Sequence, residues 1–159
     1  MKKESLKNLA SYAYILASAI FCIVALPLSV RLTFTQIQPI ASAISTFAGI
    51  LFGFVLGSIT LMASAKDNTL IKNIGKTGYL RRFTEEMHST MGWLLSVCII
   101  FIVLLFFPDT LKFRIPYITK DVECTYAQLL LQLGIFVLLI TFKKFYITWL
   151  RLKEITKLM

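Results

Sequence analysis

Long apolar runs alternate with short charged stretches along this chain. A transmembrane helix needs roughly 20 consecutive, mostly apolar residues. Four windows qualify and contain no charged residue: residues 9–30, 41–65, 89–107 and 125–142. The pattern predicts an all-α integral membrane protein, a four-transmembrane-helix bundle that forms a single membrane domain over residues 1–159.

The lysines and arginines between these windows are unevenly distributed. Of the 17 in the chain, 13 lie in the N-terminal segment, the loop 66–88 and the tail 143–159, and the other two connections hold four. Connections rich in Lys and Arg stay on the cytoplasmic side of a membrane. We therefore predict that the N- and C-termini and the loop 66–88 are cytoplasmic.

Composition supports the same class of protein. Hydrophobic residues make up 57% of the chain and charged residues 16%, whereas soluble domains are about a quarter charged. The net charge of +9 is explained by basic residues beside the spans, which meet anionic headgroups of the lipid bilayer. Direct nucleic-acid binding is not expected, because no soluble fold is left to carry a basic patch.

Two segments on the predicted cytoplasmic side continue the helices beyond the membrane. No glycine or proline interrupts residues 79–88 or the tail 143–159, so we predict uninterrupted helices there. Apolar residues of the tail recur at three- and four-residue steps, with basic residues behind them. This stripe can pack on a partner protein or lie on the lipid surface. The candidate cytoplasmic partner contacts are Phe145, Trp149, Arg151, Leu152, Lys72, Arg81 and Arg82.

The two predicted external connections, residues 31–40 and 108–124, are short and partly alternating in polarity. Alternation allows extended strands. The two segments can pair with each other as a small ribbon, or they are irregular loops whose aromatic residues lie on the headgroups.

A row of small residues stands out in the second window. In lipid, helices associate where small residues let their backbones approach closely, so the row is predicted to face another helix. That helix belongs either to the same chain, where Ala13 and Ala17 offer a groove, or to another copy in a homo-oligomer. The row consists of Ser45, Gly49, Gly53 and Gly57.

Gln128 and Gln132 share one face of the fourth window. Amide side chains in lipid need hydrogen-bond partners, so this face is buried in protein or lines a wet cavity. The two alternatives are interhelical hydrogen bonds and the lining of a pore.

The sequence offers no support for catalysis, a metal site or a cofactor. His88 is the only histidine, the three cysteines show no metal-binding spacing, and phosphate-binding glycine loops are absent. Glu85 and Glu86 are expected to pair with Arg81 and Arg82, one helical turn earlier. We predict that the chain is not an enzyme.

One stretch resembles membrane proteins of bacterial phage defence. Ser45–Gly49, the rest of the second window, a basic loop and Gly78–Tyr79 look like the corresponding stretch of the membrane protein of the lambdoid Rex exclusion system (RexB). Span number and order also resemble those of the membrane subunit of the Kiwa system (KwaA). The first resemblance implies an ion channel that depolarises the cell. The second implies an oligomeric sensor of infection that works with a cytoplasmic effector.

Two functions remain in view. The first is a sensor or scaffold of an anti-phage defence system, which oligomerises in the bacterial inner (cytoplasmic) membrane and docks a cytoplasmic effector protein. Its basis is the pair of helical extensions and the lack of catalytic residues. The alternative is an oligomeric pore that depolarises the membrane, based on the glycine row, the glutamine face and the resemblance to the Rex protein.

Overall fold

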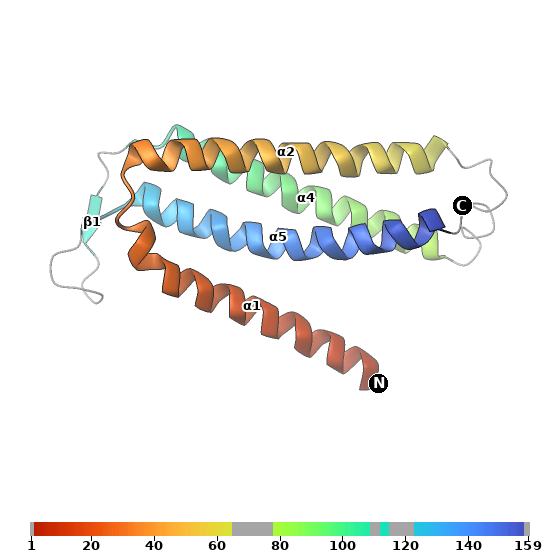
Figure 1. The fold of residues 1–159 in the computed structure, drawn as a ribbon. Helices are drawn as coiled ribbons and strands as arrows, with labels where there is room; N and C mark the ends of the chain where they lie inside the picture. Colours follow the sequence, from red (N-terminus) through yellow and green to blue (C-terminus); the bar gives the residue numbers. More distant parts are fainter. Residues whose placement is uncertain (1, 65–77, 109–111, 115–122, 158–159) are drawn as a thin grey trace.

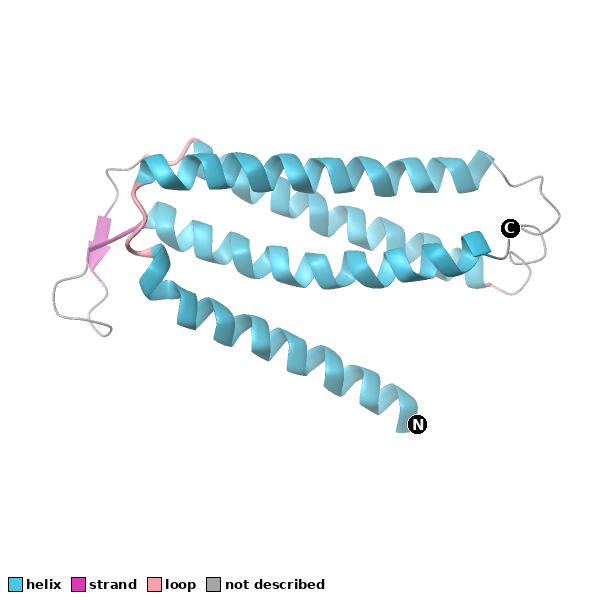
Figure 2. Cartoon of the chain, viewed as in Figure 1, coloured by secondary structure: helices cyan, strands magenta, loops and turns pink. Residues whose placement is uncertain are grey.

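The computed structural model of the chain describes residues 2–64, 78–108, 112–114 and 123–157. Four long helices run along one another, with a small two-stranded ribbon at one end (Figure 1; Figure 2). All four are long and apolar enough to cross a membrane. The start of α1 and the end of α5 lie at the end opposite the ribbon, so we call the two ends of the bundle the ribbon end and the terminal end. The helices are α1 (Lys2–Ser29), α2 (Phe34–Ser64), α4 (Tyr79–Leu105) and α5 (Tyr126–Lys157).

The helices extend beyond the apolar windows of the sequence. α4 begins at Tyr79 and α5 continues to Lys157, which confirms uninterrupted helices in the described part of both extensions. α2 begins at Phe34 and includes residues for which the sequence allowed an extended strand. The cause is a capping box: the backbone N–H of Thr33 donates to the side-chain oxygen of Gln36 at 3.1 Å. The Thr-x-x-Gln spacing is visible in the sequence, and reading these residues as a strand was wrong.

The ribbon forms within the second connection. Strand β1 (Lys112–Arg114) pairs antiparallel with β2 (Glu123–Thr125), and Phe113 lies opposite Cys124. The alternative in which the two connections pair with each other therefore does not hold for the described residues. The first connection is too short to pair, because the Thr33 cap turns the chain into α2 at once.

Helices α2, α4 and α5 form a packed unit with α4 in contact with both others. At the ribbon end the core includes Ala41 and Ala48 of α2, Phe101 of α4 and Leu131 of α5. Towards the terminal end a second core gathers around five buried residues. These are Val55, Phe83, Met87, Leu94 and Ile155.

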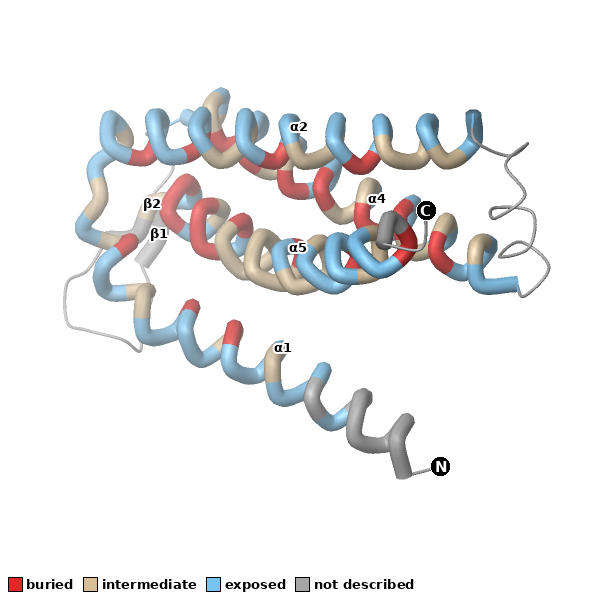
Figure 3. Tube along the Cα trace, turned by 45° about the vertical axis from the view of Figure 1, so that its right-hand side comes forward, coloured by how far each residue is buried: buried red, intermediate tan, exposed pale blue. Residues whose placement is uncertain are grey.

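Helix α1 stands apart from this unit. Among the described residues its extensive contacts are with α5 alone, and it diverges from the other helices towards the terminal end (Figure 1). Figure 3 shows buried positions only along one narrow side of α1. Its exposed side chains are largely apolar, which suits a helix that faces lipid.

Candidate functional site

The glycine row of α2 lies on the open side of the bundle. A Cβ atom built on Gly49, Gly53 or Gly57 would meet no atom of another helix within 4 Å, and all three glycines are exposed. Ala13 and Ala17 of α1, the suggested partners in the same chain, are also exposed. The alternative in which the glycine row packs within the chain is therefore wrong for the described residues.

Helical geometry explains why the row leaves the core. A helix turns about 100° per residue, so four-residue steps rotate a row by about 40° each, whereas seven-residue steps rotate it by only about 20°. The buried residues Ala41, Ala48 and Val55 are seven apart and stay on one side of α2. Ser45 is still half-buried, and its carbonyl oxygen accepts a hydrogen bond from the Cys98 thiol at 3.5 Å. Each further four-residue step turns the row away from the core, so Gly49, Gly53 and Gly57 are exposed.

Gln128 ties the start of α5 to the turn between α1 and α2. Its side-chain oxygen accepts a hydrogen bond from the Thr125 backbone N–H at 2.9 Å, the same capping arrangement as at the start of α2. Its amide nitrogen donates to the carbonyl oxygens of Val30 at 2.9 Å and Leu32 at 3.1 Å. The Gln128 amide is thus saturated by the chain's own backbone.

Gln132, one turn further along α5, faces α1. Its amide nitrogen donates to the carbonyl oxygen of Cys22, while its side-chain oxygen is buried without a hydrogen-bond partner. Further along the same contact, the Tyr14 hydroxyl donates to the carbonyl oxygen of Leu139 at 2.9 Å. Gln132 therefore bonds across the α1–α5 contact, as the interhelical alternative describes, whereas Gln128 bonds to the turn that follows α1.

The terminal half of α5 is fastened to α4 by polar contacts. The hydroxyl oxygens of Thr90 and Thr148 lie 2.9 Å apart and are buried. Lys144 donates to the Ser89 hydroxyl at 3.1 Å, and its ammonium lies 4.9 Å from the centre of the Trp93 ring. These contacts hold the two helices together where the sequence placed the membrane boundary.

The tail residues proposed as partner contacts are used mainly by the bundle itself. Arg151 forms an ion pair with Glu86 of α4, and Leu152 packs beside Ile155 in the second core. Phe145 and Trp149 lie 6.3 Å and 5.5 Å from the Phe54 ring of α2, measured between ring centres. The stripe and the basic residues behind it are therefore partly occupied within the chain, because α2 and α4 are also long enough to run beside the tail. Trp149 stays 43% exposed, and partner contact by the tail stays a prediction.

The basic loop residues divide into three cases. Arg81 pairs with Glu85 at 3.1 Å, as the sequence predicts. Arg82 is exposed at the terminal end. Lys72 lies outside the described residues. Glu86 reaches across to α5, so its predicted pairing within α4 was wrong.

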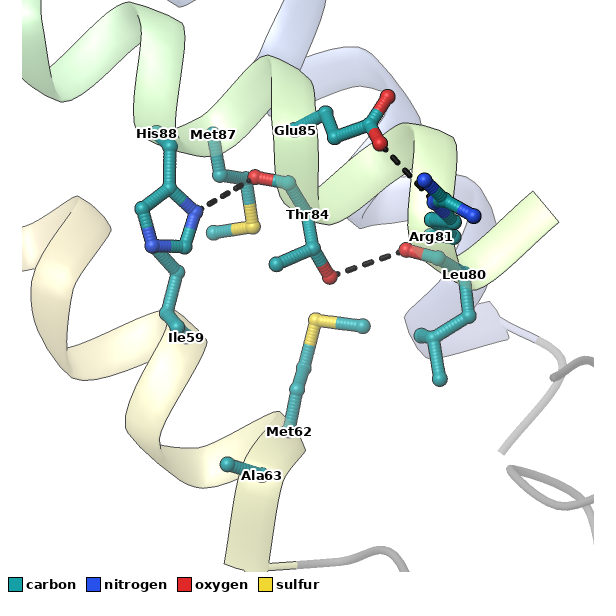
Figure 4. A pocket seen from close by; sticks show the side chains of 9 residues that line it. All are labelled: Ile59, Met62, Ala63, Leu80, Arg81, Thr84, Glu85, Met87 and His88. Atoms are coloured by element: carbon teal, nitrogen blue, oxygen red, sulfur yellow. Dashed lines mark hydrogen bonds and ion pairs between the residues drawn. The ribbon is translucent and has the colours of Figure 1, made fainter. Parts of the chain in front are cut away.

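A groove of about 670 Å³ lies between α2 and α4 at the terminal end. Figure 4 shows Ile59 and Met62 of α2 facing Thr84 and His88 of α4 across it. The Thr84 hydroxyl donates to the backbone of its own helix at 2.9 Å, and His88 Nδ1 lies 2.9 Å from the Thr84 carbonyl oxygen. Within the described ranges, no three His, Cys, Asp or Glu side chains gather as a metal site.

Comparisons with known proteins do not assign the chain to a family. No family model matches the chain, and no curated protein or solved structure matches it either.

Proposed function

We propose that this chain is a self-associating scaffold or sensor in the bacterial inner membrane, which docks a cytoplasmic effector of an anti-phage defence system. The observation that carries self-association is the exposed glycine row of α2. Glycine costs about 1 kcal/mol in helix propensity relative to alanine. Three glycines on a surface that meets no helix of this chain are best explained by a helix of another copy, because close backbone approach stabilises helix pairs in lipid.

Cross-linking tests this interface directly. In a chain whose native cysteines are replaced by alanine, Gly53→Cys should form disulfide-linked dimers in membranes. Gly92→Cys is the matched control, because Gly92 is an exposed glycine of α4 with open space around it. Equal cross-linking at the two positions, or none at Gly53, would exclude the glycine row as the contact between copies.

A bulky substitution gives the complementary test. A Cβ atom at Gly53 meets no other atom within 4 Å, so in the Gly53→Leu variant the protomer should fold normally while the oligomer dissociates. Mass measurement in lipid nanodiscs separates the two effects. An oligomer unchanged by Gly53→Leu would refute the proposal, and Gly92→Leu controls for adding an apolar side chain to an exposed helix.

The docking of an effector is proposed for the terminal end. The helix α5, with 32 residues, is about 48 Å long, and the hydrocarbon layer of a bilayer is about 30 Å thick, so part of the bundle stands outside the hydrocarbon. With Arg151 and Leu152 engaged within the bundle, the remaining candidates among the described residues are the exposed side chains of Arg81, Arg82 and Trp149. Arg82→Glu should reduce co-purification of the effector without changing the oligomer. If the chain is a pore that works without an effector, Arg82→Glu should leave its ion flux unchanged.

Orientation and biological setting are separate parts of the proposal. Reporter fusions after Met159 should be cytoplasmic, as the distribution of Lys and Arg indicates. The role in phage defence follows from the resemblance of residues 45–49 and their surroundings alone. It is tested by phage challenge of cells that carry this gene with and without its neighbours. The pore alternative loses support on one of its three grounds, because Gln128 and Gln132 donate to backbone carbonyls of α1 and of the turn that follows it.

A further inference from the structure

Helix α1 is attached to the bundle by a narrow polar strip. Its buried residues among those described are Ser18, Cys22 and Ser29, which are small or polar. Large apolar side chains of the same helix, such as Leu16 and Val24, are exposed. The apolar interlocking that joins α2, α4 and α5 is therefore missing from the described α1–α5 contact.

The hydrogen bonds of this strip are also incomplete. The buried side-chain oxygen of Gln132 has no partner, and an unsatisfied buried acceptor opposes the contact that buries it. Beyond it the contact rests on the Tyr14 hydroxyl bond to Leu139 and on the Lys143 ammonium, which lies 4.6 Å from the centre of the Tyr14 ring. Nearer the terminal end, Lys143 donates a long hydrogen bond of 3.4 Å to the exposed Ser11 hydroxyl, the polar contact furthest along α1 among the side chains that the structure describes.

At the ribbon end the attachment is different. Gln128 donates two hydrogen bonds to the turn that follows α1, through the carbonyl oxygens of Val30 and Leu32. The same side chain caps α5. One end of α1 is thus anchored to α5 through a saturated amide, and the other end diverges from the bundle (Figure 1).

We propose that α1 is a hinged strap, which is held at the Gln128 anchor while its terminal half swings away from α5 and separates the Tyr14 hydroxyl from the carbonyl oxygen of Leu139. The packed unit of α2, α4 and α5 stays intact, because interlocked cores and the Thr90–Thr148 contact hold it. This inference concerns the motion of one chain and does not depend on the proposed function.

Electron-spin distance measurements on the full chain in lipid nanodiscs test the hinge. Spin labels on Leu9→Cys and Leu150→Cys report the α1–α5 distance at the terminal end, in a chain whose native cysteines are replaced by alanine. Labels on Leu61→Cys and Leu150→Cys report the α2–α5 distance within the packed unit. All three labelled side chains are exposed, so the labels disturb no described core.

The hinge predicts a broad or two-peaked Leu9–Leu150 distribution beside a narrow Leu61–Leu150 distribution. Tyr14→Phe removes the hydroxyl that bonds to α5 and should raise the ratio of long to short distances about fivefold, the effect of one ordinary hydrogen bond. Tyr12→Phe removes an exposed hydroxyl from the same helix and should leave the ratio unchanged. A narrow Leu9–Leu150 distribution that Tyr14→Phe does not alter would overturn the proposal, as would equal broadening of both pairs.

Discussion

Among the glycines that the structure describes, Gly134 of α5 is the one against which another helix packs. A Cβ atom at this position would lie 2.8 Å from Cζ of the Phe101 ring and 3.2 Å from Cγ2 of Ile100, both on α4. The Phe101 ring is fully buried in the core of the ribbon end and has little room to move aside. Gly134→Ala should therefore destabilise the bundle, although alanine favours the helix.

The size of the effect follows from a comparison with Gly92 of α4. Alanine gains about 1 kcal/mol of helix propensity over glycine at either position. A Cβ atom on Gly92 meets nothing within 4 Å, so Gly92→Ala should be neutral or stabilising. At Gly134 the overpacking cost of about 1–3 kcal/mol is added. Because the propensity gain is common to both, the difference between the two variants measures the overpacking alone.

Reversible unfolding in mixed micelles, followed by helical circular dichroism, measures this difference. Gly134→Ala should unfold at a lower denaturant fraction than Gly92→Ala, with a gap of about 1–3 kcal/mol in the free energy of unfolding. Phe101→Leu in the Gly134→Ala background should recover part of the loss, because the two ring atoms closest to the new methyl group are removed. Equal stability of the two alanine variants would refute the close approach of α4 and α5 at this point.

Three further changes test the contacts that organise the bundle. Gln128→Leu removes the cap of α5 and both bonds to the α1–α2 turn, and should speed hydrogen exchange at the Thr125 amide; unchanged exchange would contradict the cap. Truncation after Lys144 removes buried Ile155 and should lower the unfolding midpoint of the membrane protein itself, whereas a dispensable tail would leave it unaltered. Thr90→Val and Thr148→Val should be non-additive in a double-mutant cycle, with a coupling of about 0.5–1.5 kcal/mol, and strict additivity would show that the two hydroxyls do not interact.

Features that depend on neighbours in the chain could be predicted from the sequence. The four spans follow from apolar runs of sufficient length, and the Arg81–Glu85 pair follows from four-residue spacing on one helix. The start of α2 was missed although its signal is local. The Thr33–Gln36 capping box was overlooked because the alternation of polar and apolar residues suggested a strand.

Sequence periodicity could also identify the small residues of α2, but not their surroundings. It gives the angle of each side chain about its own helix axis and contains no information on how that helix is rotated against its neighbours. Gly53 was therefore expected beside another helix, and it meets none within this chain. Gly134 was not singled out, and it lies against Phe101.

What the sequence determined by itself is the number of apolar helices, their approximate ends and the pairs formed within one helix, because these depend on residues a few positions apart. The tertiary structure decided the rest. It turned Gln128 and Gln132 towards the backbone of α1 and its turn, laid the tail against α2 and α4, and left α1 with a single neighbour among the described helices. These outcomes depend on the relative rotation, tilt and length of several helices at once, which no local pattern encodes.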